Sequence, residues 1–350
     1  MSTPPPAHLR VVIVEDSPIV REILIDICQE DGTIEVVAEA ESGPDGLSAI
    51  RTHRPDVILL DLGLPGFDGF ELIARIMVEI PTPIIVVTAT LRPAGRQEAF
   101  HALDLGAVHV MEKPTPVEWK SPAWRKHFRQ ELRFLSTASV VRHMSWKPGG
   151  DSDRARAIDS DRRPPEIVIV VGSAGGAQTS RDVLAAMDAL PVPVLVALHL
   201  GPNLHEPLAR FFGGAIGRPV AVAAPANVLA PGTIYVAPGR HHIEFVAKGR
   251  VRVFDHLEGA IYAPSLDHLL ASSAKVYGAS ACGVILTGLG SDGAAGLLAI
   301  RQSSGRTLAQ TASSCVVAGM PRAAVSLGAV QHSLDPQRIG RLVSSWFWSR

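Results

Sequence analysis

Three residue types that together carry out acyl transfer stand at the ends of apolar runs in the second half of this 350-residue chain. Ser173 follows IVIVVG, His199 follows VLVAL, and Asp292 follows GVILTGLGS. In an open parallel sheet the carboxyl ends of the strands share one edge, where ligands bind, so these side chains can meet there. A histidine can take the proton of a serine hydroxyl, and a carboxylate can orient that histidine. The pattern therefore predicts a hydrolase with a serine nucleophile.

Each of these residues also has an ordinary structural explanation. A histidine in an apolar strand is more often a hydrogen-bonded core residue than a catalyst, and Asp292 lies in a glycine-rich loop typical of a turn. The GSAGG segment around Ser173 lacks the GxGxxG spacing and the Walker lysine of phosphate-binding loops. The three residue types at three strand ends together favour catalysis. Their order along the chain, Ser, His, Asp, differs from that of α/β-hydrolases.

A second group of polar residues follows strand-like runs in the first half. Its members are Glu15 and Asp16 after LRVVIV, Asp61 at the end of DVILLD, Thr88 at the end of PIIVVT, and Lys113 after AVHVME. Unit charges ~4 Å apart repel by about 4 kcal/mol at an effective dielectric of about 20, so three convergent carboxylates favour a divalent cation. We expect the carboxylates to bind Mg²⁺, which prefers oxygen ligands. Asp61 is then the nucleophile that forms an aspartyl-phosphate, and Thr88 and Lys113 contact the phosphoryl group.

Short β-branched runs alternate with amphipathic segments over residues 9–116. The predicted strands are LRVVIV, IEVVAEA, DVILLD, PIIVVTA and AVHVMEK. The segments 18–29, 43–51, 69–79 and 97–105 between them carry apolar residues at helical spacing. This alternation predicts an α/β domain over 9–116 with a five-stranded, doubly wound, flavodoxin-like parallel sheet.

Residues 117–165 differ in character and predict a linker. Tryptophans and charges are scattered there without apolar periodicity, and we expect a helix within 121–142 and disorder over 147–165. The α/β alternation resumes over 166–350 and predicts a second doubly wound parallel sheet. The runs TIYVAPG, HIEFVA and RVRVFD lie close together and predict an antiparallel hairpin added to this sheet.

The composition excludes several classes of protein. The formal net charge is -1, so no global field favours nucleic acid, and the second half has no basic recognition helix. Cys28, Cys282 and Cys315 are widely spaced, which predicts buried thiols in a reducing compartment. No run reaches the ~18 apolar residues of a membrane span, and the N-terminus has no apolar signal segment, so we expect a cytoplasmic protein.

Four histidines in the second half, His241, His242, His256 and His268, raise the question of a metal site. None has a spacing such as HExxH, and a Ser-His-Asp triad hydrolyses esters without a metal. We therefore expect Mg²⁺ in the first domain and no cofactor in the second.

The segments VVIVED, ILLDLGLPGFDGFEL, IIVVTA and EKP resemble the receiver domain of response regulators, over about 9–116. An acidic residue at one strand end is ordinary on its own, whereas five matching positions favour a switch. The resemblance implies phosphoryl transfer from a histidine kinase to Asp61, with Glu15, Asp16 and Asp61 holding Mg²⁺. Val110 stands where such domains commonly carry an aromatic residue.

The second half resembles the catalytic domain of the chemotaxis protein-glutamate methylesterases, over about 167–330. The matching segments are VGSAGG, ALHLGPN, GTIYVAPGRHHIE, APSLDHLL, GVILTGLGSDGAAGLLAI and AQTASSCVVAGMPRAAVSLGAV. The resemblance implies hydrolysis of glutamate methyl esters on chemoreceptors, and often deamidation of receptor glutamines, with Ser173 as nucleophile, His199 as base and Asp292 as its partner. The implied partners are methylated chemoreceptors and the histidine kinase of a chemotaxis-type pathway, with no nucleic acid and with membrane contact only through receptors.

The chain departs from the family pattern at several positions. Ala174 replaces a usual threonine, Leu289 replaces a common methionine, and Tyr262 and Ala263 stand where an arginine usually precedes Pro-Ser. One hypothesis is an esterase whose unphosphorylated receiver covers the mouth of the active site. The alternative is a receiver-controlled module that binds a kinase or receptor without catalysis, in which case replacing Ser173 leaves signalling intact.

Overall fold

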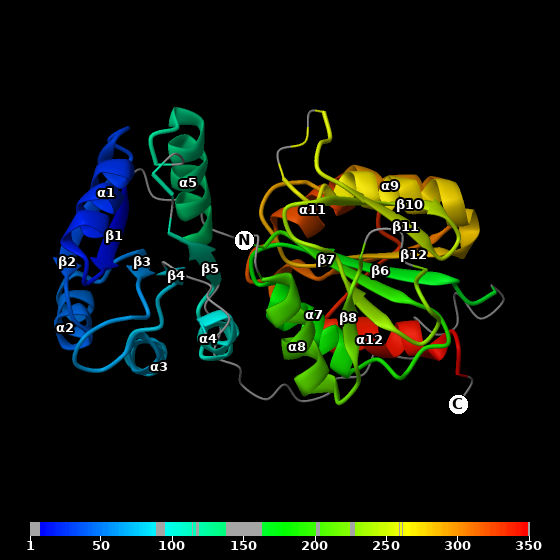
Figure 1. Ribbon diagram of the computed structural model, residues 1–350, viewed down its shortest axis with the longest axis horizontal. Helices are drawn as coiled ribbons and strands as arrows, with labels where there is room; N and C mark the ends of the chain where they lie inside the picture. The colour runs from blue at the N-terminus through cyan, green and yellow to red at the C-terminus, as the bar shows by residue number, and fades with distance from the viewer. Residues whose placement is uncertain are drawn as a thin grey trace. The chain divides into compact units, whose positions relative to one another are not determined.

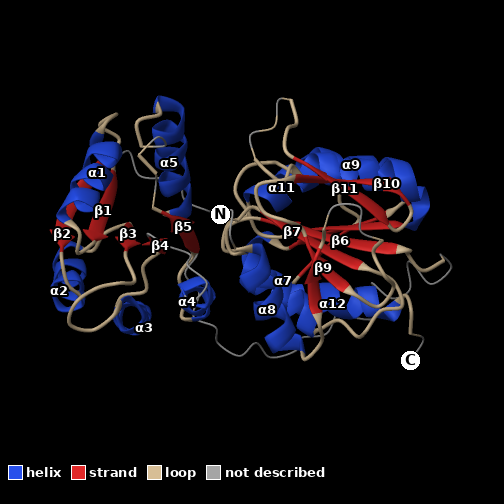
Figure 2. Cartoon of the chain, in the orientation of Figure 1, coloured by secondary structure: helices blue, strands red, loops and turns tan. Residues whose placement is uncertain are grey.

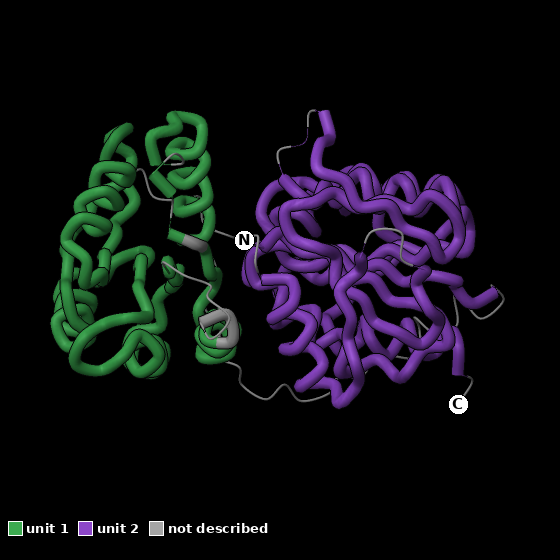
Figure 3. The backbone as a smooth tube through the Cα atoms, in the orientation of Figure 1, with its two compact units in different colours: residues 1–144 green, residues 145–350 purple. Residues whose placement is uncertain are grey.

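The computed structural model describes residues 8–88, 95–113, 115–116, 119–137, 163–200, 204–224, 228–258, 260 and 262–348. The chain divides into two compact units, residues 1–144 and 145–350 (Figure 3). Each unit contains its own parallel sheet with helices on both faces (Figure 2). The predicted two-domain α/β architecture is therefore confirmed.

The first unit is built on a five-stranded sheet of order β2-β1-β3-β4-β5, in which every pair is parallel. Its strands are β1 (Leu9–Val14), β2 (Ile34–Ala40), β3 (Val57–Leu60), β4 (Ile84–Thr88) and β5 (His109–Glu112). Helices α1 (Pro18–Gln29) and α5 (Pro122–Leu135) cover one face, and α2 (Gly43–His53), α3 (Gly69–Glu79) and α4 (Gly95–Asp104) cover the other (Figure 1). The strand order reverses between β1 and β3, which is where ligands bind in sheets of this kind.

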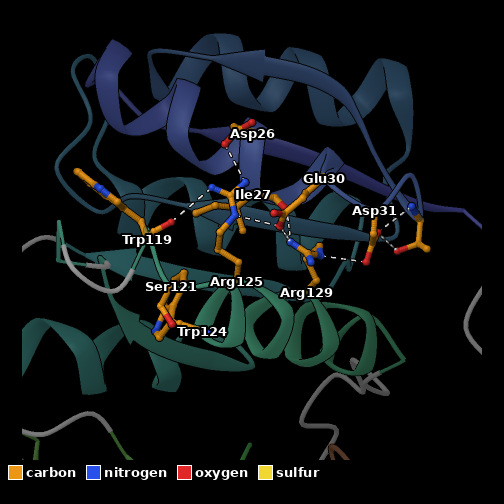
Figure 4. Close-up of polar contacts among 10 residues, drawn as sticks. Asp26, Ile27, Glu30, Asp31, Trp119, Ser121, Trp124, Arg125 and Arg129 are labelled. Carbon is orange, nitrogen blue, oxygen red and sulfur yellow. Dashed lines mark hydrogen bonds and ion pairs between the residues drawn. The ribbon is translucent and has the colours of Figure 1, made fainter.

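Helix α5, which we predicted within the linker, is part of the first unit. Figure 4 shows two of its arginines facing the last turn of α1. Arg125 contacts Asp26 at 2.8 Å and Glu30 at 2.9 Å, and Arg129 donates to the carbonyl of Ile27 at 3.1 Å. The last turn of α1 has no basic residue of its own, so these arginines supply the positive charge that a helix C-terminus favours. The disorder predicted over 147–165 falls almost wholly outside the described residues.

The second unit is built on a seven-stranded parallel sheet of order β14-β13-β12-β6-β7-β9-β8. Its strands are β6 (Ile167–Gly172), β7 (Val194–Leu198), β8 (Val220–Val222), β9 (Ile234–Val236), β12 (Ala281–Ile285), β13 (Arg306–Gln310) and β14 (His332–Leu334). Helices α7 (Gly176–Ala185), α8 (His205–Ile216) and α12 (Pro336–Ser345) lie on one face, and α9 (Leu266–Tyr277) and α11 (Gly319–Ser326) on the other (Figure 1). Helix α10 (Ala294–Gln302) packs against α9 and α11. The order reverses between β6 and β12, so a ligand site is expected at their carboxyl ends.

The predicted antiparallel hairpin is present, but it is not part of the main sheet. HIEFVA and RVRVFD form β10 (His242–Ala247) and β11 (Arg250–Phe254), a separate two-stranded sheet, whereas TIYVAPG supplies β9 of the parallel sheet. Ile243, Phe245 and Val251 of the hairpin are buried in one apolar cluster with residues of α9. The hairpin therefore packs on α9 instead of extending the main sheet, because its apolar residues are buried against that helix.

The three cysteines are buried and none forms a disulfide, as the sequence predicted. Residues of β6 are buried on both faces of the strand, since helices cover the sheet on each side. None of the helices in the described part of the chain is both long and apolar enough to cross a membrane.

Candidate functional site

Ser173 and His199 lie on neighbouring strands at the carboxyl edge of the second sheet. They directly follow β6 and β7, whose last residues, Gly172 and Leu198, are register partners. The N–H of His199 donates to the carbonyl of Gly172 (3.1 Å), and the N–H of Ser173 donates to the carbonyl of Thr287 (2.9 Å). The sheet therefore places Ser173 between the strand that leads to His199 and the loop that follows β12.

Two glycines allow the chain to pass closely around Ser173. Gly175 has a φ of +74°, and a Cβ there would lie 2.7 Å from the Cβ of Val316. A Cβ on Gly288 would lie 2.8 Å from the Cβ of Ser173, so any larger residue would displace that serine. Helix α7 starts at once, with the N–H of Gly176 donating to the carbonyl of Ser173 (2.7 Å). The positive end of a helix is thus within three residues of the candidate nucleophile.

The side chain of His199 is hydrogen-bonded to the carboxylate of Asp292. Its Nε2 lies 2.9 Å from Oδ2 of the aspartate, and the histidine is only 9% exposed. An ionised carboxylate can only accept, so Nε2 carries the proton and Nδ1 is the basic nitrogen of the neutral ring. The ring also contacts Tyr262, which stacks on it with ring centroids 4.4 Å apart and planes 21° apart. The imidazole is therefore restrained both at its edge and on its face.

Asp292 is held in place by the first turn of α9. The N–H of Leu266 donates to Oδ2 (2.9 Å), and the N–H of Asp267 donates to Oδ1 (2.8 Å). Burial by itself raises the pKa of Asp292, but the hydrogen bond and charge of His199 and these backbone donors outweigh it, so the pKa lies below its ordinary value. Asp292 is therefore ionised at neutral pH and can orient and stabilise a protonated imidazole.

Sequence reasoning missed residues that shape this site. Thr287 is fully buried, and its Oγ1 accepts the N–H of Val317 (2.9 Å) and lies 2.9 Å from the carbonyl oxygen of Ala174. It therefore ties the loop of Ser173 to the segment before α11. Tyr262 drew notice only as a departure from the family pattern, and nothing local in the sequence signals that it stacks on a histidine more than sixty positions earlier.

In the first unit, the three predicted carboxylates converge at the ends of β1 and β3. One ligand oxygen from each of Glu15, Asp16 and Asp61 lies within 4.8 Å of the others. Glu15 and Asp61 are buried, whereas Asp16 is exposed. Pairing of β1 with β3 brings the two strand ends together, and the N–H of Asp61 donates to the carbonyl of Val14 (2.9 Å).

Lys113 bridges two of these carboxylates. Its Nζ lies 2.8 Å from Oε1 of Glu15 and 2.9 Å from Oδ2 of Asp61. The backbone N–H of Lys113 donates to the carbonyl of Thr88 (2.8 Å). Thr88, the fifth predicted residue, therefore ends β4 beside the end of β5, which Lys113 follows. Burial lowers the pKa of Lys113, but its bonds to the two carboxylates raise it above the ordinary value overall. The lysine is therefore fully charged.

One lysine does not neutralise this cluster. Burial raises the pKa of Glu15, the hydrogen bond from Lys113 lowers it, and the charge of Asp61 raises it again, with a net rise above the ordinary value. A cation at this site would lower that pKa. The donor set suits Mg²⁺, because it offers oxygen ligands only and its exposed member, Asp16, leaves room for the waters that Mg²⁺ retains.

Comparison with known proteins gives the same division of the chain. A family model for the CheB methylesterase matches residues 168–343, and a model for the response regulator receiver domain matches residues 11–119. Protein-glutamate methylesterase/protein-glutamine glutaminase 1 of Syntrophus aciditrophicus is 34% identical, over 96% of this chain and 97% of its own length. Protein-glutamate methylesterase/protein-glutamine glutaminase 2 of Anaeromyxobacter dehalogenans is 35% identical, over 95% of each chain.

Among solved structures, the CheB methylesterase catalytic domain of Thermotoga maritima is 27% identical and covers 51% of this chain and 97% of its own, with a TM-score of 0.48. The response regulator domain of Thermotoga maritima CheB is also 27% identical and covers 38% of this chain and 98% of its own, with a TM-score of 0.34. The full-length sequence relatives and the family model decide the assignment. This chain belongs to the CheB methylesterase family and carries a response regulator receiver domain in front of its methylesterase domain.

Proposed function

We propose that this chain is a phosphorylation-regulated hydrolase that removes methyl esters from glutamate side chains of chemoreceptors and also deamidates receptor glutamines. The observation that carries the proposal is the 2.9 Å contact between His199 and Asp292, one strand away from Ser173 at the same sheet edge. The relatives that match over nearly the whole chain are protein-glutamate methylesterases/protein-glutamine glutaminases, which supports the same substrate class.

In the proposed reaction, the Oγ of Ser173 attacks the ester carbonyl while Nδ1 of His199 takes its proton. The resulting imidazolium is stabilised by the ionised Asp292, which keeps Nε2 as the donor. The new C–O bond to serine forms as the carbonyl π pair moves to oxygen. Collapse of this tetrahedral species breaks the bond to the methoxy group, and His199 returns the proton to yield methanol.

A water molecule completes the cycle. His199 takes a proton from water, whose oxygen attacks the acyl carbonyl, and the released Ser173 recovers its proton from the same ring. The products are a glutamate carboxylate and a free proton. With a glutamine substrate the steps are the same, and the first leaving group is ammonia. Both reactions therefore need the same nucleophile and base, with no added cofactor.

The developing oxyanion needs hydrogen-bond donors, and α7 supplies a candidate source. Its N-terminal turn starts at Gly176, and the preceding Gly175 has no side chain that could cap the helix. The first turn of a helix presents unpaired N–H groups and the positive end of the helix dipole. A single well-placed donor of this kind contributes roughly 10²–10³ in rate.

We propose that the first unit receives a phosphoryl group on Asp61. The phosphorus–nitrogen bond of a phosphohistidine on a chemotaxis-type histidine kinase breaks as an Oδ of Asp61 bonds to phosphorus. Glu15, Asp16 and Asp61 would hold Mg²⁺, which supplies positive charge toward the phosphoryl oxygens. Lys113 is already in contact with Asp61 and would pair with the new dianion, and Thr88 would donate from its hydroxyl.

The test of hydrolysis is methanol release from membranes that contain methylated chemoreceptors. We expect release by the wild type and by Ser326→Ala, which alters an exposed serine at the end of α11 in the same unit. Ser173→Ala should reduce the rate by on the order of 10⁴-fold or more, because removing a triad nucleophile leaves only binding and oxyanion stabilisation. Equal rates for the two serine variants would refute Ser173 as nucleophile. Absence of release by the wild type would favour the non-catalytic binding module.

A further inference from the structure

Asp292 and Asp267 link the N-termini of α9 and α10. Asp292, just before α10, binds the start of α9, and Asp267, in the first turn of α9, binds the start of α10. Asp292 lies two residues before α10 and accepts the N–H groups of Leu266 and Asp267, at the start of α9. Asp267 in turn accepts, through Oδ1, the N–H of Gly296 in the first turn of α10 (2.8 Å). The N-termini of α9 and α10 are thus joined by a reciprocal pair of carboxylates, and one of these is the candidate partner of His199.

Helices α9 and α10 approach each other closely at Gly296. A Cβ on Gly296 would lie 2.5 Å from the carbonyl oxygen of Asp267 and 2.7 Å from the Cβ of Leu270. The first turn of α10 is therefore in backbone contact with α9. A displacement of α10 along α9 would carry Asp292 with it, because only Gly293 separates that residue from the helix.

We propose that Asp267 is a positioning residue of the triad: its bond to the first turn of α10 sets the location of Asp292, and so the orientation of His199. This inference rests on the proposed function for its catalytic consequence. The bonds of Asp267 lead to Asp292 and to Gly296, so its effect on His199 is transmitted through Asp292. The site tolerates two neighbouring carboxylates because each faces a helix N-terminus, where negative charge is favourable.

The electrostatics of Asp267 agree with a role in positioning. Burial raises its pKa, bonds from backbone N–H groups of the α10 turn lower it, and the charge of Asp292 raises it, with a net rise. The two carboxylates of the pair therefore differ: the pKa of Asp292 is lowered and that of Asp267 is raised. An amide at position 267 retains an oxygen that can accept from Gly296, so charge and acceptor can be separated by substitution.

A plain helix-capping role is the competing explanation, and the chain offers a matched control for it. Asp335 precedes α12 in the same unit and accepts the N–H of Arg338 (2.9 Å), so its removal also deletes a carboxylate cap. It follows β14, which is three strands away from β6 in the sheet. Asp335→Ala should therefore reproduce the cost in stability without disturbing the triad.

The experiment compares full-length Asp267→Ala, Asp267→Asn and Asp335→Ala with the wild type. Two quantities are measured: kcat and KM with methylated receptor membranes, and the NMR signal of the His199 Nε2–H, identified by its loss in His199→Gln. For Asp267→Ala we expect kcat to fall by about 10²-fold, the scale of a ~1 Å misplacement, with KM within about twofold and the proton signal shifted or broadened. Asp267→Asn should keep kcat within about fivefold, and Asp335→Ala should leave both quantities unchanged.

The inference is overturned if Asp267→Ala matches Asp335→Ala in kcat and in the His199 proton signal. Should Asp267→Ala fail to fold, Asp267→Glu takes its place, since it keeps the charge but moves the oxygens by one methylene. A drop in kcat of more than about tenfold with a shifted signal supports the inference, and wild-type values refute it. The proton signal needs no substrate, so a shift in a protein without esterase activity would refute the proposed function and leave the positioning role standing.

Discussion

Asp292 in the second unit and Glu15 in the first are both carboxylates at the carboxyl edge of a parallel sheet, yet their pKa values move in opposite directions. Asp292 receives hydrogen bonds from His199 and from two backbone N–H groups, and its pKa is lowered. Glu15 shares a single lysine with Asp61, and its pKa is raised. Burial opposes ionisation at both sites, but only the second site has enough donors to overcome it.

In the second site, donors of the protein itself outweigh burial, whereas in the first site Lys113 alone does not offset burial and the charge of Asp61. At the second edge, strand register, the start of α9 and the stack of Tyr262 hold a histidine and an aspartate in contact without any added group. At the first edge, three carboxylates face one lysine. We expect a cation to relieve the repulsion among the carboxylates at the first edge, and we expect hydrolysis at the second edge to need none.

The largest expected effect is that of removing the charge of Asp292. Asp292→Asn should lower kcat for methyl ester hydrolysis by about 10³–10⁴-fold, because an amide no longer holds His199 in the productive tautomer. Phosphorylation of Asp61 should be unchanged in this variant. Asp335→Asn is the control for the loss of an aspartate elsewhere in the unit. A decrease of less than about tenfold would show that His199 acts without its partner.

A smaller effect is expected from the aromatic stack on His199. Stacked aromatic pairs contribute about 0.5–1.5 kcal/mol beyond area burial, which corresponds to at most about tenfold in rate. Tyr262→Ala should therefore lower kcat by up to about tenfold, and Tyr262→Phe should keep most of the activity, since the ring is retained. Phe254→Ala, which removes the ring that stacks on His242, is the matched control. Equal activity of Tyr262→Ala and wild type would exclude a role for the stack.

At the first edge, Mg²⁺ should raise the thermal stability of the full-length protein. Binding to the folded state alone stabilises by about 1.4 kcal/mol at a ligand concentration ten times Kd. Glu15→Gln removes one ligand and one repelling charge, so its unfolding midpoint without Mg²⁺ should be higher than that of the wild type and should rise less when Mg²⁺ is added. Scanning calorimetry with and without Mg²⁺ measures both. An equal rise in the two proteins would place the cation elsewhere.

The smallest effect is a difference in pH dependence between the two carboxylates. A lowered pKa means that Asp292 contributes stability above its unfolded pKa of about 3.9, and that this contribution is lost as pH falls through the lower folded value. A raised pKa means that ionised Glu15 costs stability as pH rises from its ordinary value through the higher folded value. In urea titrations without Mg²⁺, the gain in stability from Glu15→Gln should therefore grow over the pH range that starts at the ordinary glutamate pKa of about 4.3 and extends through the higher folded value. A constant gain over this range would contradict the raised pKa.

Much of the fold could be predicted from the sequence, because the local spacing of apolar residues indicates which segments form helices and which form strands. The alternation of β-branched runs with helical spacing indicated both parallel sheets, and HIEFVA with RVRVFD indicated the hairpin. Periodicity does not report what a helix packs against. The helix expected within 121–142 belongs to the first unit because Arg125 and Arg129 meet acidic residues about a hundred positions earlier in the chain.

The residues of the candidate sites could be predicted from the sequence to a similar degree. Strand ends in a parallel sheet gather at one edge, so residue type and position were enough to nominate Ser173, His199 and Asp292. The groups that hold these three residues in place are harder to predict from the sequence. Backbone N–H groups of α9 have no sequence signature, and the bond between Asp267 and Gly296 depends on how two helices meet. These contacts arise from tertiary packing and have no short-range pattern.

We propose that the two units form one regulated enzyme, in which a phosphoryl group on Asp61 raises the rate of hydrolysis at Ser173. The direct measurement is methanol release from methylated chemoreceptor membranes in the presence of Mg²⁺, with and without a small phosphoryl donor, for wild type, Asp61→Asn and Ser173→Ala. We predict that the donor raises release by the wild type, leaves Asp61→Asn at its basal rate, and has no effect on an inactive Ser173→Ala. Equal stimulation of wild type and Asp61→Asn would exclude control through Asp61, and release that persists in Ser173→Ala would exclude Ser173 as the nucleophile.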